Sequence, residues 1–230
     1  YTRNGFEIEW QGLKFRWGCS PVTGIILYQI SVSDPTVWRV DPNLEPVQRS
    51  VLYRANMGEL ITGYASPDYP TAARNFLDFG EFPARDNVPP LFPGIDVPHY
   101  AELVTVPVVL ADGTVYDLEN AVGIYERSDG MLWRHANYSC DLPVNIQGRT
   151  GRQLIITATH SIGNYDYAIY WIFNQDGRID VEVKATGCME CGGTNFAKTN
   201  DTFKTSTLVR PFVDAPNHWH IANVRLDFDV

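Results

Sequence analysis

Two histidines near the end of the 230-residue chain have a His-x-His spacing, within Ala215-Pro-Asn-His-Trp-His-Ile-Ala-Asn-Val-Arg-Leu-Asp-Phe-Asp229. In a β-strand, His218 and His220 project to the same face, because side chains alternate with a period of two. Two imidazoles placed in this way form a chelating pair for a first-row metal such as copper or zinc. A His-x-His alone is a weak signal, so a metal site needs support from elsewhere in the chain.

An aspartate stands in an apolar setting in Asn75-Phe-Leu-Asp-Phe-Gly-Glu81. Burial among the neighbouring Phe and Leu side chains would raise the pKa of Asp78 by desolvation, as a proton-abstracting base near neutral pH requires. The ordinary interpretation of such a carboxylate is a helix cap or a partner in an ion pair. The residues around Asp78 do not decide between these roles.

A tyrosine lies between Asn and Asp in the polar quartet Gly163-Asn-Tyr-Asp166, which two apolar, aromatic-rich runs flank. The second run ends at Gln175-Asp-Gly-Arg178, and Asp-Gly between alternating segments is a strong hairpin signal. Residues 179–183 alternate between apolar and charged, as a half-buried strand does. The ordinary interpretation of Tyr165 is a packed tyrosine whose hydroxyl is hydrogen-bonded.

The apolar runs of the chain are short, and turn signals interrupt them about every ten residues. Together with 18 Gly, 15 Pro and 13% aromatic residues, this pattern favours an all-β fold, a large antiparallel sandwich. Strands are expected within 6–32 and over 104–110 and 114–118, the last two joined by an Asp-Gly turn. Residues 51–61 are compatible with a short helix or a strand, and their periodicity does not settle which.

The chain carries a formal net charge of −9 and contains no basic run, which argues against nucleic acid as a partner. No stretch approaches the roughly 20 apolar residues of a membrane span. The first residues carry no signal peptide, so we expect a mature, processed or shortened chain. Sequons at Asn137 and Asn200 favour a secreted or extracellular location over a peroxisomal or cytoplasmic one.

Four cysteines, Cys19, Cys140, Cys188 and Cys191, permit two disulfides. Cys188-Met-Glu-Cys191 is a C-x-x-C, but no second pair completes a zinc site and no βαβ pattern suggests a thioredoxin-like motif. A local disulfide or two free thiols is the first expectation for this segment. A metal or redox role is the alternative.

The segment from Gly163-Asn-Tyr-Asp-Tyr167 through the Gln-Asp-Gly turn to Lys184-Ala-Thr-Gly187 resembles the cofactor segment of the copper amine oxidases. In that family, the enzyme's own copper and dioxygen oxidise the tyrosine of Asn-Tyr-Asp/Glu to topaquinone. The resemblance therefore implies that Tyr165 is the topaquinone precursor and that Asn164 and Asp166 wedge it in place.

The aspartate segment is similar to the family's Asp-x-Gly-Glu-Tyr string, and the resemblance makes Asp78 the catalytic base. Tyr64, in Gly63-Tyr-Ala-Ser-Pro, matches the tyrosine that hydrogen-bonds the quinone. Phe76 matches an aromatic gate of the substrate channel. Residues 93–129 depart from the family pattern: they lack its disulfide cysteines and its His-Glu-Glu-Asp string.

The family's copper motif is His-x-His preceded by Pro and followed by Arg-Leu-Asp, so the resemblance assigns copper(II) to His218 and His220. Asp227 and Phe228 match part of its secondary calcium-type site. The family's third copper histidine lies past the end of this chain. The other histidines, at positions 99, 135 and 160, match no ligand segment and are expected to be structural or on the surface.

The resemblance covers nearly all of residues 1–230, which correspond to the N-terminal half of the family's catalytic domain. It implies oxidative deamination of a primary amine by dioxygen, giving an aldehyde, ammonia and hydrogen peroxide. A companion polypeptide would complete the sandwich, and the assembled enzyme would be a homodimer. The alternative is a catalytically inactive β-sandwich relative that acts as a binding or structural module, which the missing third ligand and the altered 93–129 segment support.

Overall fold

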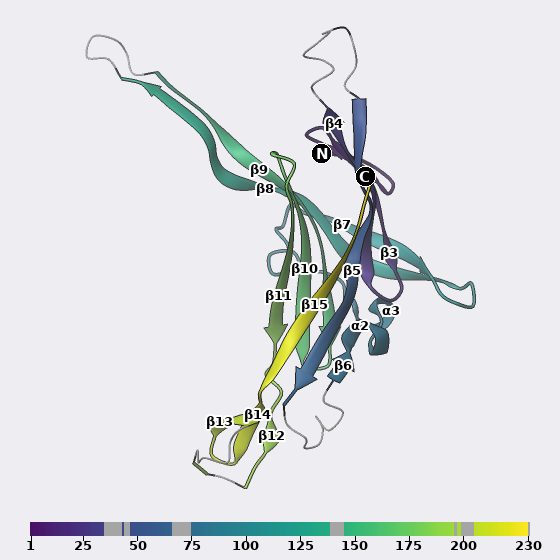
Figure 1. Ribbon diagram of the computed structural model, residues 1–230, viewed down its shortest axis with the longest axis vertical. Coiled ribbons are helices and arrows are strands. Elements are labelled where there is room, and N and C mark those ends of the chain that lie inside the picture. The colour runs from purple at the N-terminus through teal and green to yellow at the C-terminus, as the bar shows by residue number, and fades with distance from the viewer. Residues whose placement is uncertain are drawn as a thin grey trace.

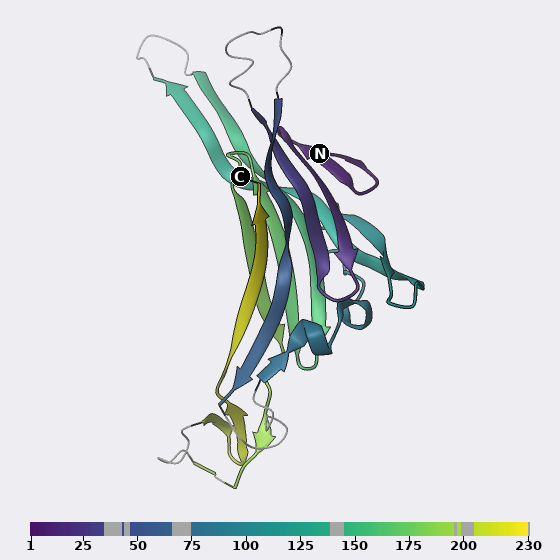
Figure 2. The ribbon, with the colours of Figure 1, turned by 45° about the vertical axis from the view of Figure 1, so that its right-hand side comes forward.

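The computed structural model describes residues 1–34, 43, 47–65, 75–138, 145–195, 197–198 and 205–229. Two antiparallel sheets face each other in these residues (Figures 1 and 2). Their main apolar core contains side chains from both sheets, among them Phe15 and Phe173, whose rings stack at 4.4 Å. The all-β antiparallel sandwich that the sequence predicts is confirmed.

The first sheet has seven strands, in the order β1-β2-β3-β4-β5-β15 with β6 beside β5. Their bounds are β1 Thr2–Asn4, β2 Glu7–Trp10, β3 Leu13–Ser20, β4 Gly24–Asp34, β5 Val47–Tyr64, β6 Asn75–Leu77 and β15 His218–Phe228. Two single-turn helices, α2 Asp78–Glu81 and α3 Ala84–Asn87, follow β6.

The second sheet has five strands in the order β11-β10-β9-β8-β7, and a separate small sheet has the order β12-β14-β13. Their bounds are β7 Glu102–Val109, β8 Val115–Asn137, β9 Asn145–Ile162, β10 Tyr165–Asn174, β11 Ile179–Gly187, β12 Gly192–Gly193, β13 Ser206–Arg210 and β14 Val213–Pro216. The predicted Asp-Gly turns lie between β7 and β8 and between β10 and β11, where both glycines have positive φ.

Strand β10 is buried on both faces, which explains its nearly continuous apolar sequence. Its odd-numbered side chains from Tyr167 to Phe173 belong to the core between the sheets. Tyr170 and Ile172 lie in a second cluster, on the outer face, with Leu91 and Val97. A one-residue slip would exchange these two sets, so packing specifies the register of β10 strongly.

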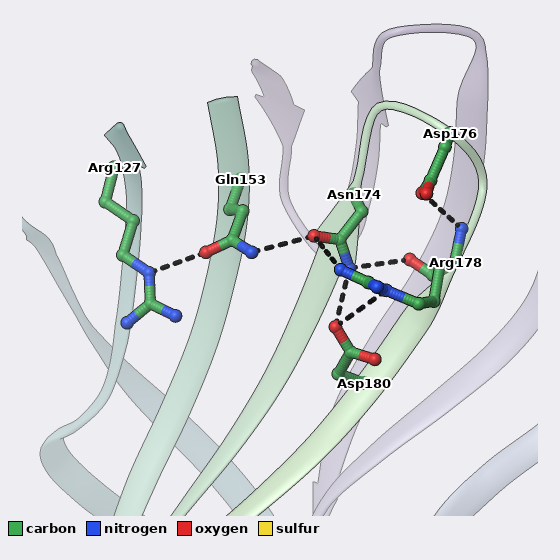
Figure 3. A network of polar contacts seen from close by, with 6 residues as sticks. All are labelled: Arg127, Gln153, Asn174, Asp176, Arg178 and Asp180. Carbon is green, nitrogen blue, oxygen red and sulfur yellow. Dashed lines mark hydrogen bonds and ion pairs between the residues drawn. The ribbon is translucent and has the colours of Figure 1, made fainter. Parts of the chain in front are cut away.

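A chain of polar contacts at the hairpin end of β10 supports the same register (Figure 3). Arg127 Nε donates to Gln153 Oε1 at 2.8 Å, and Gln153 Nε2 donates to Asn174 Oδ1 at 2.7 Å. Asn174 Nδ2 in turn donates to Asp180 Oδ2 at 2.8 Å. Gln153 and Asn174 are buried, and only this register pairs their amides, which would otherwise be costly to bury.

The segment for which the sequence left helix and strand open belongs to β5, an 18-residue strand. Its pairing with β15 is irregular, because Asn223 faces Glu59 whereas Val224 faces Met57. Gly58 is the extra residue of this β-bulge, and a Cβ there would clash with the side chain of Asn223. The bulge shifts the alternation of buried positions, which is why the periodicity did not predict a strand.

Strands β8 and β9 continue beyond the sheet as a long two-stranded arm (Figures 1 and 2). The paired residues there are Met131–Asn137 with Asn145–Thr150. Large apolar side chains of this arm are exposed, namely Met131, Leu132, Trp133, Tyr138 and Ile146. In the described part of the chain, we find no helix that is long and apolar enough to span a membrane.

Candidate functional site

Three strands each contribute two side chains, spaced two residues apart, to one end of the sandwich. On β5 and β15, which are hydrogen-bonded neighbours, Tyr64 faces His218 and Thr62 faces His220. Tyr165 and Tyr167 come from β10 of the opposite sheet. Because side chains two apart in a strand share a face, each strand points both of its side chains into the space between the sheets.

The hydroxyl of Tyr165 lies between Tyr64 and His218. It is 2.9 Å from the Tyr64 hydroxyl and 3.2 Å from His218 Nε2. Burial raises the pKa of Tyr165, while the hydrogen bond with Tyr64 lowers it. Phe76 packs edge-on against the Tyr64 ring at 5.8 Å. Tyr64, Phe76, Tyr165 and His218, which the sequence analysis singled out for different roles, therefore lie together.

Asp78 is buried, with 3% of its surface exposed, directly behind this group. The Thr62 hydroxyl donates to Asp78 Oδ2 at 2.8 Å, and the Tyr167 hydroxyl donates to the same oxygen at 2.9 Å. Desolvation raises the pKa of Asp78, and these two hydrogen bonds oppose the rise. A carboxylate whose pKa is raised by burial is the arrangement that a proton-abstracting base requires.

The protonation of the two imidazoles follows from their partners. His218 Nδ1 lies 2.7 Å from the Pro216 carbonyl oxygen, which can only accept, so Nδ1 donates. His220 Nδ1 lies 2.8 Å from the Tyr167 hydroxyl and 3.1 Å from that of Thr62. Both hydroxyls donate their hydrogen to Asp78 and can only accept from His220, so His220 Nδ1 is also a donor. In the neutral form each ring therefore has an unprotonated Nε2, as metal ligation requires. That of His218 faces the Tyr165 hydroxyl.

The two histidine rings lie 5.0 Å apart between centroids, a pair suited to a first-row metal. Among the residues that the structure describes, no three His, Cys, Asp or Glu side chains form a complete metal site. Burial lowers the pKa of His220, and the neighbouring His218 lowers it further. The neutral, ligating form of His220 is thereby favoured.

Asp227 and Phe228 lie at the far end of β15 from the histidine pair. The Asp227 carboxylate is 3.4 Å from Arg225, and the Phe228 side chain is exposed. The structure thus separates the two residues of the expected calcium-type site from the other site residues.

A carboxylate that the sequence did not single out holds α2, and with it Asp78, against β5. Glu59 accepts backbone hydrogen bonds from Phe79 at 2.7 Å and from Gly80 at 3.2 Å. It also accepts one from Leu60 at 2.9 Å. Phe79 follows Asp78 and is fully buried, so this anchor fixes the backbone on which the base stands.

The two residues beside Tyr165 are held by different segments, Asn164 by the loop after β11 and Asp166 by β9. The Asn164 side chain donates to the Glu190 carboxylate, and the Cys188 N–H donates to the Asn164 carbonyl at 2.7 Å. Asp166 accepts a hydrogen bond from the Ser161 hydroxyl at 2.5 Å. Asn164 and Asp166 are thus tied to different partners on either side of Tyr165.

His160 is fully buried beside the site and packs on Phe79 at 4.7 Å between ring centroids. Its Nδ1 has no hydrogen-bond partner among the described residues, and burial lowers its pKa from 6.5 to about 4. Between pH 6.5 and 4, His160 is therefore protonated in the unfolded chain but neutral in the native state. The contribution of neutral His160 to the free energy of unfolding is fully present above pH 6.5 and is lost as the pH falls towards 4.

We expect wild-type protein to lose about 3 kcal/mol more stability than a His160→Leu variant when the pH falls from 6.5 to 4. Urea unfolding at a series of pH values measures this difference. Parallel curves for the two proteins over that range would show that His160 does not titrate on unfolding.

A sequence profile of the copper amine oxidase enzyme domain matches residues 2–230.

The chain belongs to the copper amine oxidase family.

Relatives within this family share about 30% identity with the chain. Copper amine oxidase 1 of Schizosaccharomyces pombe is 30% identical over 227 residues, covering 99% of this chain and 30% of that protein. The peroxisomal diamine oxidase 1 of Nicotiana tabacum is also 30% identical, covering 99% and 27%. The copper methylamine oxidase of an Arthrobacter strain is 29% identical, covering 100% and 33%.

Two solved oxidase structures share the fold. The copper-containing benzylamine oxidase of Hansenula polymorpha superposes with a TM-score of 0.79 at 25% identity, covering 99% of this chain and 33% of that one. A lysyl oxidase of Pichia pastoris gives a TM-score of 0.76 at 25% identity, covering 98% and 27%. This chain therefore spans about a third of the length of the relatives it matches.

Proposed function

We propose that this chain carries the cofactor-forming and proton-abstracting part of a copper- and topaquinone-dependent primary-amine oxidase. The reaction converts a primary amine, dioxygen and water to an aldehyde, ammonia and hydrogen peroxide. The observation that supports this best is the convergence of Tyr64, Asp78, Tyr165, His218 and His220, with the Tyr165 hydroxyl 3.2 Å from His218 Nε2.

In this proposal, His218 and His220 hold copper(II) through Nε2, and Tyr165 is the topaquinone precursor. Copper supplies the oxygen chemistry that forms the quinone, and the quinone supplies the electron sink for amine oxidation. The chain holds two histidine ligands, and a third comes from the part of the protein outside it. Calcium at Asp227 and the Phe228 carbonyl stays a separate prediction.

The described side chains have distinct tasks in turnover. Asp78 accepts the proton from the carbon next to the amine nitrogen, and Thr62 and Tyr167 hold its carboxylate in one orientation. Tyr64 fixes the ring of Tyr165 through its hydroxyl, and Asn164 and Asp166 limit its movement. Phe76, beside Tyr64, is placed to act as the substrate gate.

The mass of the tryptic peptide 153–178, which contains Tyr165, tests this proposal. Protein isolated with the rest of its catalytic domain should show a gain of roughly 14 Da, from one oxygen added and two hydrogens removed. A Tyr165→Phe variant provides the baseline. An unmodified Tyr165 in copper-loaded, aerated protein would favour the alternative, a β-sandwich relative that acts as a binding or structural module.

A second prediction concerns the pH dependence of this reaction. The Thr62 hydroxyl lowers the pKa of Asp78, so a Thr62→Val variant, which keeps the shape, should have a higher Asp78 pKa. Because the base must be ionised, the acid limb of the kcat/KM profile should move to higher pH. Profiles of wild type and variant measure this shift, and superimposable limbs would show that another group controls it.

Two exposed surfaces support further parts of the proposal. Strand β15 ends the first sheet in the described residues and exposes Trp219, Ile221, Leu226 and Phe228. We propose that the remaining two thirds of the protein, or a companion polypeptide, covers it.

The apolar arm of β8 and β9 (Figure 2) is suited to reach a second copy in a homodimer. Light scattering of the assembled protein measures its oligomeric state.

The extracellular location is a prediction that rests on the two sequons, and two tobacco relatives are named as peroxisomal. A shift in mass after treatment with an endoglycosidase would confirm glycosylation at Asn137 or Asn200.

A further inference from the structure

The loop that follows β11 carries two exposed cysteines next to the candidate site. Cys188 and Cys191 are both exposed and not bonded to each other. Cys19, by contrast, is shielded, and burial raises its pKa to about 12. Thiols react as thiolates and must be reached by the oxidant, so the exposed pair is the reactive one among the described cysteines.

This loop is tied directly to the neighbours of Tyr165. The Cys188 N–H donates to the Asn164 carbonyl, and the Asn164 side chain donates to Glu190. Gly187, with a φ of +99°, approaches so closely that a Cβ there would clash with the backbone of Asn164 and Asp166. The start of the loop is therefore fixed against β10, and Glu190 connects the rest of the loop to the Asn164 side chain.

A disulfide between the two cysteines has to close within residues 188–191. Gly187 before them is paired in β11, and Gly192 and Gly193 after them form β12, so the flanking backbone stays in place. A disulfide requires the two Cα atoms to come within about 4.4–6.8 Å, which a four-residue segment reaches only as a tight turn. Closing that turn would move Met189 and Glu190, the two residues inside the ring.

We infer that Cys188 and Cys191 form a peroxide-sensitive dithiol that closes reversibly to a disulfide and so displaces Glu190 from Asn164. One thiolate attacks hydrogen peroxide, giving a sulfenic acid and, with a proton, water. The other thiolate then displaces the sulfenic hydroxyl, forming the S–S bond and releasing hydroxide, which takes up a proton to give a second water. Two thiols lose two hydrogens, and one peroxide is reduced to two waters.

A metal site is the weaker use of this pair. Two thiolates need further ligands for zinc, and among the described residues no third His, Cys, Asp or Glu joins them. Hydrogen peroxide is also a product of the proposed reaction, so the oxidant would arise near the loop. That source rests on the proposed function, whereas the chemistry of the dithiol does not.

Peptide mapping after brief exposure to added hydrogen peroxide tests the inference. Both cysteines lie in one tryptic peptide, residues 185–198, separate from Cys19, Cys140 and Tyr165. We expect this peptide to become about 2 Da lighter and to resist alkylation, and dithiothreitol should restore two alkylatable thiols. The Cys19 thiol should stay unmodified, and a Cys191→Ser variant should show no such loss.

Two further measurements distinguish a failure of the dithiol inference from a failure of the proposed function. Hydrogen exchange of the segment around Asn164 should speed up in the oxidised protein, and a Glu190→Ala variant should reproduce this without peroxide. Two alkylatable thiols after peroxide treatment, or sulfinic acids without a disulfide, would overturn the inference even if Tyr165 carries its mass gain. A disulfide beside an unmodified Tyr165 would instead leave the inference intact and count against the proposed function.

Discussion

Replacing Asp78 with asparagine should lower kcat/KM for primary-amine oxidation by about a thousandfold, the range over which a positioned general base contributes. The amide is nearly isosteric with the carboxylate and still accepts the hydrogen bonds of Thr62 and Tyr167, but it cannot take up the substrate proton. Asp78 makes no hydrogen bond to Tyr165 in the structure. The Tyr165 peptide should therefore keep its gain in mass, and aldehyde production measures the loss.

The stability of the same variant shows whether the loss is chemical or structural. Burial raises the pKa of Asp78, so the native state binds a proton more readily than the unfolded chain. Wild-type stability consequently falls as the pH rises from the unfolded pKa near 3.8 through the raised native pKa. Asp78→Asn avoids this cost, and its melting temperature should equal or exceed that of wild type at neutral pH.

Two outcomes would contradict this assignment. A variant that retains most of the amine oxidase activity would show that another group removes the proton. A variant that loses the Tyr165 mass gain, with an unchanged melting temperature, would place Asp78 in cofactor formation instead. Glu59→Gln is a useful companion, because it weakens the anchor of α2 without altering the base itself.

The sequence predicted best those features that depend on neighbouring residues. The Asp-Gly hairpin of β10 and β11 and the shared face of His218 and His220 follow from local turn chemistry and period-two alternation. The 51–61 segment could not be assigned, because the bulge at Gly58 exists only in the pairing of β5 with β15. A bulge depends on a partner strand more than 150 residues away, which periodicity cannot reveal.

The same limit explains which site residues were missed. Thr62 and Tyr167 are ordinary strand residues in the sequence, and their role is the hydrogen bonds that they donate to Asp78. A usable signal was present in the spacing. Thr62 lies two positions from Tyr64, and Tyr167 lies two positions from Tyr165, so each shares a strand face with a residue already assigned to the site. Glu59 and Glu190 carried no comparable signal, because their contacts join segments that are distant in the chain or separated by a turn.

Replacing His218 with alanine should abolish the mass gain of Tyr165 and reduce the copper content of the protein. His218 Nε2 points at the Tyr165 hydroxyl, and its Nδ1 is fixed by the Pro216 carbonyl. Loss of an orienting partner of this kind costs roughly ten- to a hundredfold in metal affinity, and loss of the ligand itself should cost more. Only His220 and the proposed third histidine would remain, so copper would be bound much more weakly and without the ligand that faces the Tyr165 hydroxyl.

His135→Ala is the matched control for this experiment, because His135 is exposed on the β8–β9 arm, where it stacks with Trp133. That variant should bind copper and modify Tyr165 as wild type does. If His218→Ala keeps the quinone, the metal is held elsewhere and the geometry of the histidine pair has another purpose. If the His218→Ala and His135→Ala variants both lack the quinone, the cause is a defect in folding or assembly. Only a loss confined to His218→Ala would show that the copper ligand lies on β15.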